Sequence, residues 1–329
     1  MRVSFIRVLT LVALWTTAAV CSNVNIEIGA FSVYTVSSPR ITYSSEFRNS
    51  ANPFRDKFGG IADDNWKDVW LTTETCSNIQ GIEFPTIPEQ QLQSQIHGSS
   101  SWQISMGEAF AFYEFVKSSG ALDGAKCFLD FGCGWGRMTR PFMRDFDLGK
   151  IYGFEPNALH AIIARSLNPY FTVFTGGFSP DGSIPKDWFD LVVGWSIFSH
   201  LSEKSLKEWL TEICSVLRPG GHAVFTTWGI RFLKRLQGEQ ALLDAGQEIH
   251  WYSKQCLDGV GNISKRIADY ENGDFIWFTN TDSTEYGEAF LGEKALNRFV
   301  SELDLPMEVT TFDATSLAQD VFILRKRQW

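Results

Sequence analysis

From Gly120 onward, the chain alternates short apolar runs with longer segments whose apolar residues recur every three or four positions. The short runs predict buried strands, and the wider spacing predicts amphipathic helices. The predicted strands span 127–131, 151–154, 171–175, 189–194 and 223–227, with a final pair at 307–312 and 321–324. The predicted helices span 105–118, 158–167, 203–217 and 293–303. Asn157 and Ser202 precede two of these helices and are residue types that cap helix N-termini.

A further helix is predicted from the end of the first strand through Phe146, shortened or kinked by Pro141. Strands that alternate with amphipathic helices in this way are typical of a parallel sheet covered by helices on both faces. The pattern therefore predicts the α/β class, with a doubly wound sheet.

Three segments lie outside this alternation. Residues 1–21 join a basic start to a short apolar run and small residues, which is the layout of a signal- or anchor-like segment. Residues 22–104 are polar and rich in turn residues, and we interpret them as an N-terminal extension with little core of its own. Residues 230–291 form an insert too long for a simple connection, and its aromatic residues suggest a lid over a ligand.

Composition narrows the classes of function. The 29 basic and 38 acidic residues give a net charge of −9, which argues against nucleic acid as a partner. The six cysteines contain no C-x-x-C pair, and no His, Cys and carboxylate cluster has metal-ligand spacing, so no metal site is predicted. Aromatic residues make up 14% of the chain, and they belong either to the core or to a ligand cavity.

The first predicted strand ends in a glycine-rich loop, where a doubly wound sheet binds its ligand. Gly132, Gly134 and Gly136 give G-x-G-x-G, which lets the backbone turn tightly but is a weak indication by itself. Asp130 precedes the loop and suits a ligand with an ammonium group rather than a pyrophosphate. Glu155 ends the second strand, where an acid can bind both ribose hydroxyls. A nucleoside with a cationic amino-acid tail fits these residues better than NAD or ATP.

Four segments resemble the successive motifs of the class I S-adenosylmethionine-dependent methyltransferases: FLDFGCGWGR (128–137), YGFEPN (152–157), FDLVVGWSIFSHL (189–201) and LRPGGHAVFTT (217–227). The resemblance implies a methyltransferase domain over residues 105–329 with a Rossmann-like, doubly wound sheet, the insert inside it and an antiparallel last strand. It also implies S-adenosyl-L-methionine as the cofactor.

The resemblance further assigns roles to single residues. Gly132, Gly134 and Gly136, with Trp135 in the same loop, would wrap the methionine part of the cofactor, and Asp130 would lie near its amino group. Glu155 would hold the ribose, Pro156 would lie at the adenine edge and Phe178 would stack on the adenine. Gly194, Trp195 and Ser196 would border the sulfonium and the acceptor.

The implied activity is methyl transfer to an oxygen or nitrogen of a small-molecule acceptor, such as a sugar or a secondary metabolite. An acceptor hydroxyl needs a general base, for which His200 is the candidate, although a histidine here also fits a role in orienting the loop. Two alternatives stay open: a non-catalytic cofactor-binding partner subunit, and a nicotinamide-dependent oxidoreductase, which the glycine spacing and Asp130 disfavour. Because the methyl donor is cytosolic, we expect a cytoplasmic catalytic domain, with residues 1–21 as a membrane-surface anchor, an unprocessed leader or an extended start.

Overall fold

The computed structural model describes residues 24–26, 34–36, 52–97, 101–279 and 283–328. The chain divides into two compact units, Met1–Ser44 and Ser45–Trp329. In the first unit, β1 (Val24–Ile26) pairs antiparallel with β2 (Tyr34–Val36). The signal- or anchor-like segment 1–21 lies outside the described residues. None of the helices in the described ranges has the length and hydrophobicity needed to cross a bilayer.

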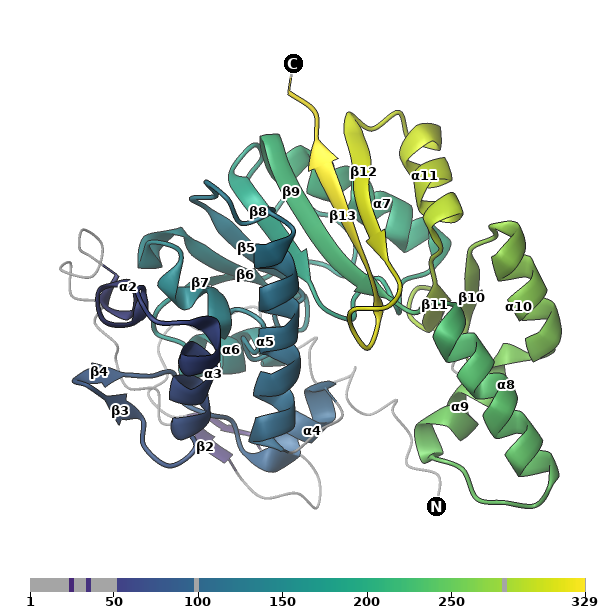
Figure 1. The fold of residues 1–329 in the computed structure, drawn as a ribbon, viewed down its shortest axis with the longest axis horizontal. Coiled ribbons are helices and arrows are strands. Elements are labelled where there is room, and N and C mark those ends of the chain that lie inside the picture. Colours follow the sequence, from purple (N-terminus) through teal and green to yellow (C-terminus); the bar gives the residue numbers. More distant parts are fainter. Residues whose placement is uncertain (1–23, 27–33, 37–51, 98–100, 280–282, 329) are drawn as a thin grey trace. The chain divides into compact units, whose positions relative to one another are not determined.

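The second unit is built on a seven-stranded sheet with the strand order β12-β13-β9-β8-β5-β6-β7 (Figure 1). Its strands are β5 (Phe128–Phe131), β6 (Ile151–Phe154), β7 (Thr172–Phe174), β8 (Phe189–Gly194), β9 (Leu217–Thr227), β12 (Met307–Asp313) and β13 (Asp320–Lys326). The strands from β7 to β9 are parallel, whereas β13 runs antiparallel to both β9 and β12. The predicted Rossmann-like sheet with an antiparallel last strand is confirmed.

Helices cover both faces of the sheet, as the apolar runs in its strands require. On one face, α5 (Trp102–Ser118) and α6 (Ala158–Leu167) share a buried cluster with alternate strand residues such as Phe128 and Val193. On the other face, α7 (Glu203–Val216) and α11 (Glu293–Glu302) pack on strand residues such as Leu129 and Val192. The carboxyl ends of the parallel strands meet at one edge, where the predicted ligand residues lie.

The helix predicted after the glycine loop is wrong. Residues 134–139 form turns, followed by two short 3-10 helices, η3 (Arg140–Arg144) and η4 (Leu148–Lys150). Pro141 has no N–H for an α-helical hydrogen bond and lies at the start of η3. The carbonyl of Pro141 instead accepts a hydrogen bond from Nε1 of Trp66, at 2.9 Å.

Residues 52–97 are more ordered than their polar composition led us to expect. They form α2 (Pro53–Phe58), α3 (Asp63–Thr72), the short strands β3 (Asn78–Ile79) and β4 (Ile82–Glu83), and α4 (Gln90–His97). Five buried aromatic residues of this segment join the cluster that also contains α5: Phe54, Phe58, Trp66, Trp70 and Phe84. The segment therefore contributes to the core of the second unit.

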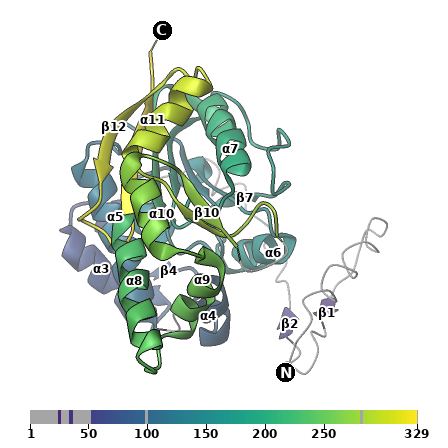
Figure 2. The ribbon, with the colours of Figure 1, turned by 90° about the vertical axis from the view of Figure 1, so that its right-hand side faces the viewer.

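The insert is a small subassembly with its own apolar cluster. It contains α8 (Ile230–Asp244), α9 (Trp251–Val260), α10 (Ile263–Asn272), and the antiparallel pair β10 (Ile276–Phe278) and β11 (Glu288–Phe290). The three helices lie side by side in both views (Figure 1, Figure 2). The insert begins directly after β9, and therefore at the sheet edge that holds the glycine loop.

Candidate active site

The glycine loop connects the end of β5 to the turns before η3. Gly132 (φ 74°), Gly134 (φ 53°) and Gly136 (φ 91°) all have left-handed backbone conformations, which favour glycine. A Cβ atom at Gly132 would collide with the side chain of Ile197, and one at Gly136 would collide with the ring of Phe171. The loop therefore requires glycine both for its backbone and for its close packing.

Two buried carboxylates flank this loop. Asp130 is 1% exposed and its Oδ2 accepts a hydrogen bond from Oγ1 of Thr139 at 2.6 Å. Burial raises the pKa of Asp130 to about 7, although the Thr139 hydrogen bond lowers it in part. Glu155 accepts hydrogen bonds from the N–H groups of Gly134 and Asn157, both at 2.9 Å, and burial raises its pKa as well. The charge of Arg137 lowers the pKa of Asp130 in part, but Arg137 forms its ion pair with Glu108. Within the described ranges neither acid forms an ion pair with Lys or Arg, so the two acids suit a cationic ligand.

The side chain of Trp135 packs into the core and anchors the glycine loop there. Its ring is 1% exposed, 6.1 Å from the ring of Trp102 and 4.7 Å from the guanidinium carbon of Arg140. Its carbonyl accepts a hydrogen bond from Nδ2 of Asn168 at 2.8 Å. The indole is thus part of the core, and any contact of Trp135 with a ligand would be made by its backbone.

The residues predicted at the adenine side lie beyond β6 and β7. Pro156 is half-buried and follows Glu155 directly. Phe178 is 68% exposed, and its carbonyl accepts a hydrogen bond from Nε1 of Trp209 at 2.9 Å. The hydrogen bond from Trp209 fixes the backbone of Phe178, and the ring of Phe178 is exposed. Stacking of this ring on the adenine stays a prediction.

The loop after β8 carries the next predicted residues. Gly194 is buried, and a Cβ atom there would collide with the ring of Phe225. The ring of Trp195 packs edge-to-face on Phe112, with 5.4 Å between centroids. Ser196 has a φ of 60°, a strained conformation for a residue other than glycine and one that clusters at functional sites.

Hydrogen bonds fix Ser196 despite this strain. Its N–H donates to Oγ1 of Thr226 at 2.7 Å, and its Oγ accepts from Nε2 of Gln319 at 2.8 Å. The Oγ atoms of Ser196 and Ser199 lie 3.0 Å apart. The loop is thus held to both β9 and the connection before β13.

His200 lies in the same loop and faces two environments. Its Nδ1 is 2.8 Å from the carbonyl oxygen of Gly287 and 3.7 Å from Oε2 of Glu288. Its Nε2 is 3.5 Å from Oγ of Ser196, and its ring stacks on Tyr286. Because a carbonyl only accepts hydrogen bonds, we assign Nδ1 as the donor to Gly287, which leaves Nε2 as the ring nitrogen that can accept a proton. This arrangement can accept a proton on the side of Ser196.

A cavity of about 340 Å³ opens beside His200 and is lined largely by the insert. Its lining includes His200, Trp251, Tyr252, Phe278, Tyr286 and Glu288. Cavities of this size that combine aromatic walls with a few polar groups are typical of small-molecule sites. The insert therefore supplies a candidate acceptor site next to the predicted base.

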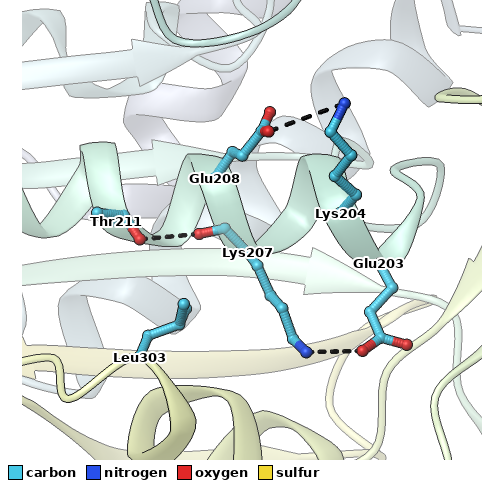
Figure 3. A pocket seen from close by; sticks show the side chains of 6 residues that line it. All are labelled: Glu203, Lys204, Lys207, Glu208, Thr211 and Leu303. Atoms are coloured by element: carbon cyan, nitrogen blue, oxygen red, sulfur yellow. Dashed lines mark hydrogen bonds and ion pairs between the residues drawn. The ribbon is translucent and has the colours of Figure 1, made fainter.

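A larger hollow of about 560 Å³ lies along α7 and next to Leu303 (Figure 3). Its cationic side chains are neutralised by ion pairs: Lys207 contacts Glu203 at 2.7 Å and Glu302 at 2.9 Å, and Lys204 lies 3.9 Å from Glu208. Ion pairs of this kind are typical of a solvated helix surface. We therefore place the candidate site at the sheet edge and not in this hollow.

Sequence reasoning missed Glu288, Gln319 and the carbonyl of Gly287. All three contact the loop after β8 from segments far along the chain: Gly287 and Glu288 lie where β11 begins, and Gln319 lies in the connection before β13. None has a periodic or motif context that distinguishes it in the sequence. Tyr252 and Tyr286 were noticeable only as aromatic residues of the insert.

Known proteins resemble this chain over the segment that carries the site. Residues 108–260 match a family model described as a methyltransferase domain. An uncharacterized methyltransferase of Geobacillus kaustophilus (strain HTA426) is 28% identical over 153 residues, which cover 46% of this chain and 69% of that protein. One from Geobacillus thermodenitrificans (strain NG80-2) is 26% identical over the same shares. The match to the family model includes the glycine loop, Glu155 and His200, whereas Glu288 lies beyond it.

Solved structures also resemble the chain. The crystal structure of an S-adenosylmethionine-dependent methyltransferase from Mesorhizobium loti is 16% identical, covers 65% of this chain and 97% of its own, and superposes with a TM-score of 0.42. A SAM-dependent methyltransferase of Methanosarcina mazei is 17% identical, covers 65% of this chain and 98% of its own, and superposes with a TM-score of 0.41.

Proposed function

We propose that the chain is a class I S-adenosylmethionine-dependent methyltransferase and that it methylates a hydroxyl or amine of a small-molecule acceptor. The match of residues 108–260 to a methyltransferase-domain model supports this function over the alternative of a nicotinamide-dependent oxidoreductase. The observation that carries the proposal is His200, which lines the cavity of about 340 Å³ while its Nε2 faces Ser196 in the loop after β8. The net charge of −9 supports a small molecule over nucleic acid.

The sheet edge fits S-adenosylmethionine on two observations. Asp130 and Glu155 are buried there, and no ion pair with Lys or Arg neutralises either of them within the described part of the chain. The glycine positions admit no Cβ, so the backbone can lie close to a ligand. In this proposal Asp130 lies near the ammonium group, Glu155 accepts hydrogen bonds from the ribose hydroxyls, and Pro156 and Phe178 border the adenine.

When bound, the cofactor supplies a methyl group on a sulfonium, which leaves as a neutral thioether. In-line displacement of this kind depends mainly on alignment and on exclusion of water. Gly194, Trp195 and Ser196 would border the reacting methyl group, since they follow the central strand β8. His200 would take the acceptor proton at Nε2 as the new bond to carbon forms. The carbonyl of Gly287 orients the imidazole for this step.

Acceptor-dependent release of S-adenosylhomocysteine tests the proposal. We would incubate the protein with S-adenosylmethionine and matched sets of sugars, amino sugars, alcohols and amines, and identify methylated products by mass spectrometry. Turnover with at least one small molecule is expected. Normal cofactor binding without turnover across the whole set would instead favour the non-catalytic partner subunit.

A substitution series tests the role of His200. His200→Ala should lower kcat by a factor of about 10² to 10⁴, the usual contribution of a positioned base, while the Kd of S-adenosylhomocysteine stays unchanged. His160→Ala on α6 is the matched control, because His160 does not line the cavity. If His200→Ala retains full turnover, the histidine only orients the loop.

A cytoplasmic catalytic domain follows from the cytosolic supply of the methyl donor. Residues 1–21 would then be a membrane-surface anchor, an unprocessed leader or an extended start. Mass spectrometry of the native N-terminus, combined with membrane fractionation, separates these three options.

A further inference from the structure

One carboxylate of the cavity is not explained by the methyl transfer itself. Oε2 of Glu288 accepts hydrogen bonds from the hydroxyl of Tyr252 at 2.8 Å and from Nε1 of Trp228 at 3.0 Å, and it lies 3.7 Å from Nδ1 of His200. All of these contacts use the same oxygen. Across the described residues no donor is within hydrogen-bond distance of Oε1, and Glu288 lines the cavity. One oxygen of Glu288 is therefore left for a ligand.

The charge of Glu288 has His200 as its only basic neighbour within ion-pair distance in the described part of the chain, at 3.7 Å from Nδ1. The two hydrogen-bond donors are neutral groups, and no Lys or Arg forms an ion pair with Glu288 anywhere in the described ranges. Burial raises the pKa of Glu288, which means that the ionised carboxylate is poorly solvated. A glutamine amide could accept the same two hydrogen bonds without this cost. The carboxylate is thus best explained by a ligand that uses its charge.

Aromatic faces border the same cavity. Trp251 is 68% exposed and Tyr286 is 51% exposed, which is unusual for side chains of this size. Aromatic rings attract cations through their π faces, and the attraction adds to that of a nearby carboxylate. Aromatic rings and a carboxylate without a Lys or Arg partner in the described ranges, around one cavity, are the combination that recognises an ammonium group.

We propose that the acceptor carries a protonated amine, which is bound by Glu288 and the exposed rings of Trp251 and Tyr286. The inference rests on the proposed function. Nδ1 of His200 faces Glu288, whereas Nε2 faces Ser196 at the end of β8. The charged nitrogen and the methylated atom therefore lie on opposite sides of the imidazole, and the methylated hydroxyl or amine is a second group of the same molecule.

Binding of two probes of nearly equal shape tests the charge preference. Cyclohexylamine, which is protonated at pH 8, and neutral cyclohexanol would be titrated into the protein saturated with S-adenosylhomocysteine, with affinity followed by NMR. Hydrogen bonds to a charged group are worth enough for the amine to bind about tenfold more tightly or better. Glu288→Gln should bring the two affinities together, because it keeps the hydrogen-bond acceptor and removes the charge.

Glu271→Gln is the matched control, since Glu271 belongs to the same insert but forms a surface ion pair with Lys234. It should leave the preference for the amine unchanged. Trp251→Ala provides a second variant that leaves the core intact, because the indole is mostly exposed, and it should reduce the preference by a few-fold.

Equal affinity of the wild-type protein for the two probes would overturn the proposal, as would a preference that survives in Glu288→Gln. Binding is read without turnover, so the result is independent of the proposed reaction. A missing preference for the amine would contradict the ammonium site but not the proposed methyl transfer. Absence of turnover with every acceptor would contradict the proposed function but not the ammonium site.

Discussion

The buried carboxyl group of Asp130 should make cofactor binding depend on pH near neutrality. Its pKa is raised to about 7 by burial, so the group changes charge within the range where the enzyme can be assayed. An ammonium ligand prefers the ionised form. The affinity of S-adenosylhomocysteine, which keeps the ammonium group of the cofactor, should therefore rise with pH and level off above the pKa.

The size of the effect follows from the ionised fraction. With a pKa of about 7, roughly one-tenth of the Asp130 side chains are ionised at pH 6 and roughly nine-tenths at pH 8. If only the ionised form binds, the apparent Kd equals the intrinsic Kd divided by this fraction, and binding should be about tenfold weaker at pH 6 than at pH 8. Isothermal titration calorimetry over this range measures the effect directly.

Two variants make this test specific. Asp130→Asn should weaken binding at pH 8 and flatten the profile, because the titrating group is gone. Asp145→Asn is the matched control, since burial raises the pKa of Asp145 to about 6 but the residue lies after η3, away from the glycine loop. A Kd that is constant from pH 6 to pH 8 in the wild-type protein would refute the reasoning, and so would an unchanged slope in Asp130→Asn.

Three further substitutions test the framework around the loop. Gly132→Ala should weaken binding of S-adenosylhomocysteine about tenfold or more, because a left-handed backbone conformation is costly for alanine. The control Gly149→Ala should leave the affinity unchanged, because the space around Gly149 is open. Equal affinities of the two variants would contradict the requirement for glycine at position 132. Asn168→Ala leaves a backbone carbonyl of the glycine loop unpaired and should lower the free energy of unfolding by about 1–3 kcal/mol in urea titrations. Arg140→Met removes hydrogen bonds to two carbonyls and should speed proteolysis within residues 53–97; unchanged cleavage there would show that the aromatic packing alone holds the segment.

The sequence predicted best those elements that depend on neighbouring residues. The predicted helix after β6 begins and ends as α6 does, because Asn157 accepts hydrogen bonds from the N–H groups of residues 159 and 160. The same holds for Ser202, whose side chain caps α7. The parallel pairing from β7 to β9 was also predicted from the alternation of strands and helices, since parallel strands need crossover connections that are usually helical.

Tertiary contacts decided what the sequence did not reveal. The segment 52–97 looked irregular because its apolar residues are widely spaced, yet Trp66 and Trp70 are fully buried. Two arginines explain part of this: Arg140 lies 5.6 Å from the ring of Trp70, and Arg144 lies 5.4 Å from the ring of Trp66. Cation–π contacts between segments this far apart leave no periodic pattern in either of them.

The acceptor side of the site could not be predicted because it is assembled from two segments that meet only in the folded chain. Backbone hydrogen bonds join the loop after β8 to the start of β11: the N–H of Gly287 donates to the carbonyl of His200, and the N–H of Ala289 donates to that of Ser199, both at 2.8 Å. The imidazole of His200 returns a third bond to Gly287. His200 and Glu288 are therefore held in one hydrogen-bonded unit, although the match to the methyltransferase family model ends at residue 260. In the proposed function, the family motifs predict the cofactor side of the site, whereas residues of the insert, which follow the matched segment, would select the acceptor.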